Sequence, residues 1–195
     1  MTDVQQRVDA SRHETSRHLT FAQLEAALHA LPPAPKDSGR LTCIVRSPVS
    51  EVRELLSQAR LSPEAGLPGD KWGARASRKL EAQLAVMQHG VAELIANGQS
   101  LALFGDNLIA DLDLSVANLP IGSRLRVGGA VVEVTPLPHD GCSKFKARFG
   151  SDALRFVNTP PMRHLNLRGI HWRVIEAGEV EVGSVVKVLS RPAAA

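Results

Sequence analysis

The segment 138–145 holds the residues with the clearest chemical potential, reading Pro-His-Asp-Gly-Cys-Ser-Lys-Phe between a predicted strand and a predicted helix. Unpaired amides at a helix N-terminus stabilise a thiolate, and so do nearby cations, here Lys144 or a protonated His139. Cys142 is therefore a candidate metal ligand or nucleophile, with His139 as a second candidate catalytic residue. The alternative is an incidental free cysteine in a loop, or one tucked under the helix.

The spacing of His139 and Cys142 also fits part of a zinc site, with His164 and His171 downstream. Structural zinc sites are normally built from two tight ligand pairs, and no second tight pair appears in this sequence. Zinc is therefore the weaker interpretation. We expect His171 to be a surface or barrel-wall side chain.

Two segments carry an excess of positive charge that could bind an anion. Residues 71–79 contain four cations and no acid, in a glycine-bearing loop that can offer both amides and charge to a phosphate. Residues 141–173 contain seven cations and one acid, Asp152. The alternative for both is a solvated basic surface. The candidate anion-binding residues are Lys71, Arg75, Lys144, Arg163 and Arg168. Asn107, in Gly105-Asp106-Asn107-Leu108, could bind a heterocycle or simply close an Asx turn.

Composition limits the class of protein. The 195 residues carry a formal charge of +3 and only seven aromatic residues, too mild a charge and too few rings to predict nucleic-acid binding. No apolar run approaches the roughly 18 residues that span a membrane, and residues 1–18 lack a signal-peptide core. Two cysteines are too few for a disulfide framework, so we expect free thiols in a reducing cytoplasm.

Short strands and closely spaced turns predict a mainly β protein, a closed or nearly closed barrel decorated with short helices. Residues 1–40 are expected to form a loose polar tail to about residue 18, a helix with a capping box at Thr20 and Gln23, and a proline-rich linker. Residues 41–190 would form the barrel domain. Cys43 should be buried in its first strand. Other expected elements include a helix over 51–60, a loop over 62–79, a hairpin at Gly128-Gly129, helices over 143–149 and 151–157, and a turn over 178–183.

Taken in order, these segments resemble the MOSC domains, named after the C-terminal domain of molybdenum-cofactor sulfurases. The resemblance runs from about residue 41 to 189. It rests on GLPGDK at 66–71, GDNL at 105–108, LPIGSRLRVG at 119–128, PHDGCSKF at 138–145, RGI at 168–170 and EAGEVEVGSVV at 176–186. Ser123 and Ser184 stand where the family often has aspartate after glycine.

The resemblance implies a barrel related to that of pyruvate kinase, with Cys142 as the characteristic cysteine. In related proteins this thiolate ligates the molybdenum of a pterin cofactor, or is proposed to carry sulfur as a persulfide. Members include the amidoxime-reducing components and the hydroxylaminopurine-resistance proteins, which reduce N-hydroxylated compounds. A thiolate suits such a metal centre, and the anionic pterin needs cations around it.

Three functions follow as alternatives. The first is a molybdenum–pterin-binding protein, with Cys142 on the metal and Lys71, Arg75, Asn107, Lys144, Arg163 or Arg168 on the pterin; as an enzyme it would be an oxidoreductase. The second is a sulfur carrier on Cys142, and the third is a barrel that only binds a partner protein. We expect no iron–sulfur module and no pyridoxal-phosphate desulfurase domain, although the family is associated with the latter. Electrons or sulfur would then come from a separate electron donor or cysteine desulfurase.

Overall fold

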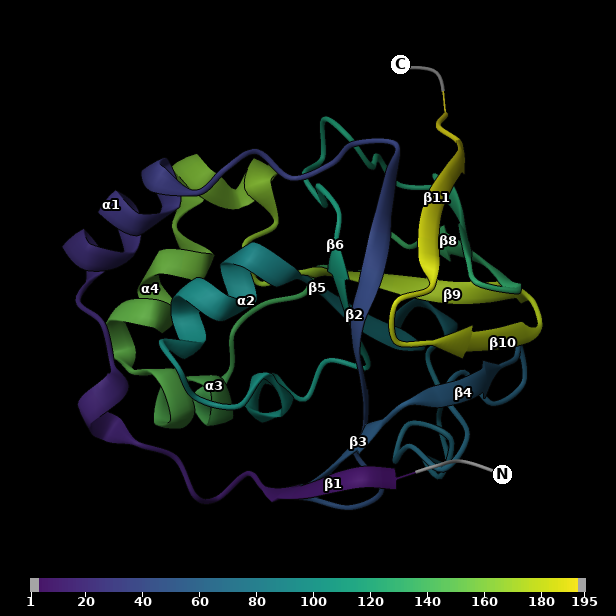
Figure 1. Ribbon diagram of the computed structural model, residues 1–195, viewed down its shortest axis with the longest axis horizontal. Coiled ribbons are helices and arrows are strands. Elements are labelled where there is room, and N and C mark those ends of the chain that lie inside the picture. The colour runs from purple at the N-terminus through teal and green to yellow at the C-terminus, as the bar shows by residue number, and fades with distance from the viewer. Residues whose placement is uncertain (1–3, 193–195) are drawn as a thin grey trace.

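The protein is a closed seven-stranded β-barrel, seen in a computed structural model that describes residues 4–192 (Figure 1). Around the barrel the strand order is β2-β11-β7-β8-β9-β5-β6, and β6 pairs back with β2 to close it. Neighbouring barrel strands are antiparallel except for β5 and β6. The barrel strands are β2 (Ser38–Arg46), β5 (Leu84–Gln88), β6 (Leu108–Asp111), β7 (Arg124–Val127), β8 (Ala130–Val134), β9 (Ile170–Glu176) and β11 (Val185–Ser190). The predicted barrel fold is confirmed.

The helices gather on one side of the barrel, at the left of Figure 1. The first begins with the predicted capping box, in which Thr20 and Gln23 bond each other's backbone. It packs against the second and fourth helices, and the third packs against the fourth. They are α1 (Phe21–Ala30), α2 (His89–Ala96), α3 (Ser143–Phe149) and α4 (Ser151–Asn158), with 3-10 turns η1 (Thr15–Arg17), η2 (Leu80–Ala82), η3 (Leu101–Phe104) and η4 (Pro160–Leu165).

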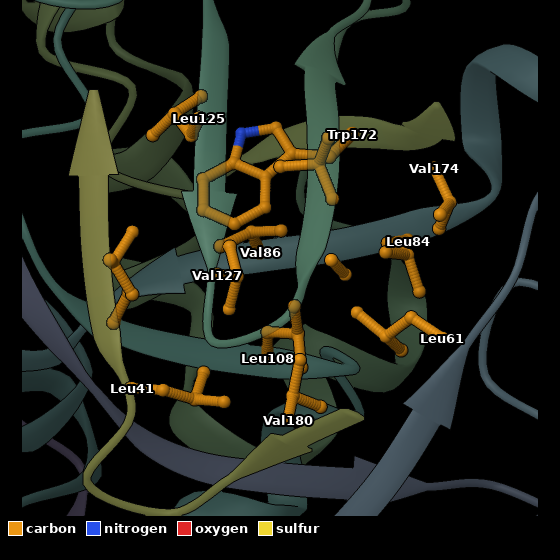
Figure 2. Packing of buried hydrophobic residues seen from close by; sticks show 14 of the residues in the cluster. Leu41, Leu61, Leu84, Val86, Leu108, Leu125, Val127, Trp172, Val174 and Val180 are labelled. Carbon is orange, nitrogen blue, oxygen red and sulfur yellow. The ribbon is translucent and has the colours of Figure 1, made fainter. Parts of the chain in front are cut away.

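Strand periodicity creates two hydrophobic cores. In β5, Val86 points into the barrel while Met87 faces the helices, and in β6 Leu108 and Ile109 divide in the same way. Figure 2 shows the barrel core, where the indole of Trp172 extends among aliphatic side chains that include Val86 and Leu125. The shared strands β2, β5 and β6 therefore separate the barrel core from the helical core.

The predicted helix over residues 51–60 is wrong. This segment forms two strands, β3 (Val52–Leu56) and β4 (Gln58–Leu61). Glu51 has φ +60°, which a right-handed helix cannot contain, and β3 pairs with β2 on one side. Its other edge is covered by β1 (Val4–Asp9), so the loose tail expected there is wrong as well. Tertiary pairing thus overrides the local helix signal.

The predicted turn over residues 178–183 is a short strand, β10 (Gly178–Glu181), which pairs with β4. This ribbon adds Leu61 and Val180 to the barrel core (Figure 2).

Gly128 takes the positive φ that the β7–β8 hairpin requires. The expected boundary between residues 40 and 41 falls inside β2. Across residues 4–192, no helix has the length and apolar character needed to cross a bilayer.

Candidate functional site

Cys142 lies at the N-cap of α3 with its side chain exposed. Its carbonyl accepts a hydrogen bond from the amide of Lys146 (2.9 Å), which starts the helix. On its other side, the amide of Gly141 donates to Oδ1 of Asn158 in α4 (3.2 Å). The thiol is thus presented to solvent by a backbone fixed at both ends. The sequence predicted the helix that follows Cys142 but left open whether the thiol is exposed. Cys43 is buried in β2, also as predicted, and burial raises the pKa of its thiol to about 11.

The helix that follows Cys142 is fastened to the rest of the protein by Arg148. This buried guanidinium donates to the carbonyls of Ala10 (3.0 Å) and Leu103 (2.9 Å) and forms a short ion pair with Glu51. Phe149 adds a stacked contact with Phe104, with ring centroids 4.1 Å apart. Arg148 is one of the seven cations of residues 141–173. Its contacts hold the helix in place, so it is a structural residue.

Glu51 also holds Lys144, the cation nearest to Cys142 in sequence. Nζ of Lys144 lies 2.5 Å from Oε1 of Glu51 and donates to Oγ of Ser50 at 2.8 Å. Hydrogen bonds from Lys144 and then Arg148 lower the pKa of Glu51 to about 2, although burial opposes them. The β2–β3 loop therefore carries an acid that faces the start of α3, a contact that the predicted helix at 51–60 concealed.

A buried polar cluster lies beneath the Cys142 loop, formed by Asp106, His139, Arg168 and His171. Both carboxylate oxygens of Asp106 accept from Nη1 of Arg168, at 3.0 and 2.7 Å. Nδ1 of His139 lies 3.4 Å from Oδ1 of Asp106, and its ring centroid is 4.5 Å from that of His171. The Arg168 guanidinium also lies over the ring of Phe145 in α3, 5.1 Å from its centroid. The structure thus brings His139 and Arg168, two of the candidate site residues, into one buried cluster.

His139 is neutral in this setting, which corrects the expectation that a protonated His139 supports the thiolate. Burial first, then the positive charges of Arg168 and His171, lower its pKa well below 6.5. His171 is also buried, with Nδ1 donating to the carbonyl of Leu137 (3.1 Å), so the sequence underestimated its place in the site.

Arg53 is a site residue that the sequence did not reveal, because its segment was predicted to be a helix. It lies in β3 with 2% of its surface exposed, and it forms no ion pair with a carboxylate of the described chain. Its Nε atom has no hydrogen-bond partner within residues 4–192. The guanidinium packs on Gly105, where an added Cβ would lie 3.0 Å from Nε. Arg53 and Arg168 therefore lie on either side of the Gly105-Asp106 turn.

Lys71 lies near Arg53. Burial lowers the pKa of its ammonium, and the positive charges of Arg53, Lys144 and Arg75 lower it further, while the nearby carboxylate of Asp70 opposes them. Among the residues that the structure describes, Lys71 forms no ion pair. We call Arg53, Lys71, Lys144 and Arg168 the cationic cluster. It draws together parts of the two basic segments, residues 71–79 and 141–173.

The side-chain amide of Asn107 is engaged in two hydrogen bonds within the protein. Its Nδ2 donates to Oδ2 of Asp70 (3.2 Å) and its Oδ1 accepts from the amide of Ala85 (3.0 Å). Asp70 also accepts from the amides of Ser47 (2.8 Å) and Trp72 (2.9 Å). The amide group of Asn107 thus ties the Lys71 loop to the barrel.

The remaining predicted cations lie at the surface. Arg163 is exposed and lies 3.4 Å from Asp140, and Arg75 is exposed in the loop near Lys71. Within the described residues no group of three or more His, Cys, Asp or Glu side chains could hold a metal ion. The zinc interpretation built on His139, Cys142, His164 and His171 therefore finds no support in the geometry.

The fold and site together define a small β-barrel protein with one exposed thiol and a cluster of four cations, of which Arg53 and Lys71 form no ion pair within residues 4–192. A sequence model of the MOSC domain matches residues 79–187, more than half of the chain, so the chain belongs to the MOSC domain family. No curated protein matches the chain.

Solved structures agree on the fold. YiiM from Escherichia coli superposes with a TM-score of 0.55 at 21% identity, covering 80% of this chain and 72% of that one. The YUAD protein from Bacillus subtilis superposes with a TM-score of 0.58 at 16% identity, covering 77% of this chain and 95% of that one. At these identities the similarity establishes the barrel, and the chemistry must be argued from this chain's own residues.

Proposed function

We propose that this protein binds a molybdenum–pterin cofactor, with Cys142 as the protein's ligand to the metal. The observation that carries the proposal is the buried guanidinium of Arg53, which packs beside the Asp106–Arg168 pair. Arg53 forms no salt bridge among the described residues, although the charges of Glu51, Asp70 and Asp106 act on it. Burying a guanidinium without a salt bridge is costly, so the burial of Arg53 supports an anion bound beside it.

The residues present fit this cofactor. Nε of Arg53 and Nε of Arg168 are buried donors without partners within residues 4–192, and Lys71 is a half-buried ammonium that forms no ion pair there. They would hold the anionic groups of the pterin. One exposed thiolate cannot by itself hold a metal ion, but it can complete the coordination of a metal that brings its other ligands with it. When bound, the molybdenum would supply two-electron chemistry, such as reductive removal of oxygen from an N-hydroxylated compound.

Around that chemistry the chain's own residues have defined tasks. Arg148 and Glu51 fix the helix that presents Cys142, and Asp106 holds Arg168 in place. His139 keeps a neutral imidazole next to the site. The electrons would come from a separate donor protein.

The test is the molybdenum content of three proteins purified in parallel from cells with an intact cofactor pathway. Wild type and Cys43→Ala should retain the metal, because Cys43 is buried in the helical core. Cys142→Ala should lose at least tenfold. Equal metal content in wild type and Cys142→Ala would contradict the proposal.

Exposure of the Cys142 thiol also favours the second function, a sulfur carrier that accepts a sulfane sulfur from a cysteine desulfurase. Intact-mass measurement after incubation with a desulfurase and cysteine would then show one added sulfur on wild type and Cys43→Ala. The same adduct on Cys142→Ala, or none on wild type, would exclude this function.

A further inference from the structure

A cavity of about 490 Å³ opens beside the segment that leads to Cys142. Its walls come from residues 116–121, the end of β8 and the following residues 135–139, the start of β9, and Pro192. Nearly all of these side chains are apolar, and none of the described residues that line it is Lys, Arg, Asp or Glu. Val116 and Ile121, 51% and 60% exposed, leave apolar surface open to solvent. Such a volume and composition are typical of a site for a small organic molecule.

The hydrogen-bonding groups of this cavity are few, and most of them are already engaged. Oγ1 of Thr135 donates to the carbonyl of Glu81 (2.6 Å), and Nδ2 of Asn166 donates to the carbonyl of Leu114 (2.8 Å). His139 is the exception, because its imidazole makes no hydrogen bond within the described part of the chain. Its side chain is 12% exposed, and Nδ1 faces Asp106 at 3.4 Å.

His139 thus belongs both to the cavity and to the polar cluster under Cys142. Gly169 permits this arrangement, because a Cβ there would lie 3.3 Å from Nδ1 of His139 and 2.1 Å from the carbonyl oxygen of Val86. The charges of the site lie elsewhere, in the cationic cluster, of which no member lines the cavity. An anion is therefore favoured at the cationic cluster, and a neutral molecule in the cavity.

We propose that this cavity binds a neutral small molecule with an apolar body and one hydrogen-bonding group directed at His139. This identification of the occupant rests on the proposed function: the cavity holds the apolar part of the substrate. The polar end of the substrate would then face the loop that carries Cys142. Charged compounds would be disfavoured, since no charged side chain of the lining compensates them.

The test uses benzamide as a neutral probe and benzoate as its charged counterpart, with the full chain observed by methyl NMR. Benzamide should shift the methyl resonances of Ile121, Val134 and Ile170 saturably, and benzoate should bind at least tenfold more weakly. Ile121→Asp should weaken benzamide binding at least tenfold. Val182→Asp, at an exposed apolar residue outside the cavity lining, should bind as wild type does.

Benzamide binding that leaves these methyl resonances unchanged, or that Ile121→Asp does not alter, would overturn the inference. The same titration on Cys142→Ala separates it from the proposed function. Benzamide should still bind there although the metal is lost. If the protein contains molybdenum but the methyl shifts are absent, only the inference about the cavity fails.

Discussion

Buried charge is the most informative feature at the scale of single residues. Arg148 and Arg168 are buried with acidic partners, Glu51 and Asp106, whereas Arg53 is buried without one in the described chain. The two paired arginines have structural contacts that explain them. Arg53 forms no salt bridge within the described chain, although the charges of Glu51, Asp70 and Asp106 act on it, and the proposed function gives it a role in binding an anion.

Glu51 makes the free energy of unfolding depend on pH in the acid range. Its pKa is about 2 in the folded protein and 4.5 as the ordinary value, so between these values the unfolded chain binds a proton that the folded chain does not. The stabilisation is present above about pH 5 and is lost as the pH falls towards 2. Glu51→Gln should lower the unfolding free energy at pH 7 by about 1 kcal/mol and flatten this acid dependence.

Urea unfolding at a series of pH values measures this effect. Glu25→Gln, at an exposed acid of α1, is the matched control and should follow wild type. An acid limb in Glu51→Gln as steep as that of wild type would assign the dependence to other carboxylates.

At the scale of elements, the loop over residues 62–79 shows how a segment with little regular structure is positioned. Asp70 accepts hydrogen bonds from the amides of Ser47 and Trp72 and from the side chain of Asn107. The loop is thereby tied to the end of β2 and the start of β6, which fixes Lys71 within the cationic cluster. GLPGDK and GDNL, distant in sequence, meet through this single carboxylate.

Asp70→Ala should lower the unfolding free energy by about 2–4 kcal/mol, because it leaves three buried donors without their acceptor. Asp70→Asn should cost less, since its amide oxygen still accepts. Glu64→Ala, at an exposed acid of the same loop, should be nearly neutral. Thermal denaturation orders the three variants, and equal losses for Asp70→Ala and Glu64→Ala would refute this role.

At the scale of the whole molecule, the two hydrophobic cores share their walls. Strands β2, β5 and β6 send alternate side chains to the barrel core and to the helical core, so neither core can open without disturbing these strands.

The two basic segments differ in how many of their cations form ion pairs. Most cations of residues 141–173 pair with acids, among them Arg148 with Glu51 and Arg173 with Glu133, whereas the cations of residues 71–79 form no ion pair within residues 4–192.

Because strands β2, β5 and β6 belong to both hydrophobic cores, we expect the protein to unfold in a single transition. Leu125→Ala in the barrel core and Leu24→Ala in the helical core remove the same group from fully buried sites, and each should cost about 2–5 kcal/mol. Circular dichroism and tryptophan fluorescence should report coincident transitions in both variants. Separate transitions in Leu24→Ala would show that the helical layer unfolds independently.

Much of the fold was predictable because its signals are local. The capping box of α1, the strand around Cys43, the Gly128 hairpin and the helix after Cys142 each depend on neighbouring residues, and each was confirmed. The segment at 51–60 was mistaken because its strand identity comes from pairing with β1 and β2. Arg53 was missed for the same reason, since its burial comes from packing and not from its neighbours in sequence.

The sequence by itself determined the family, the barrel and a cysteine directly before a helix, because ordered motifs and short-range propensities are written along the chain. The exposure of that cysteine was decided by the tertiary structure. Only the tertiary structure decided which charges form ion pairs. The sequence placed the largest cationic excess at 141–173, but most of these cations form ion pairs with acids outside that segment. Arg53 is buried and Lys71 half-buried, and neither forms an ion pair within residues 4–192. Pairing and burial depend on distances that no sequence interval specifies.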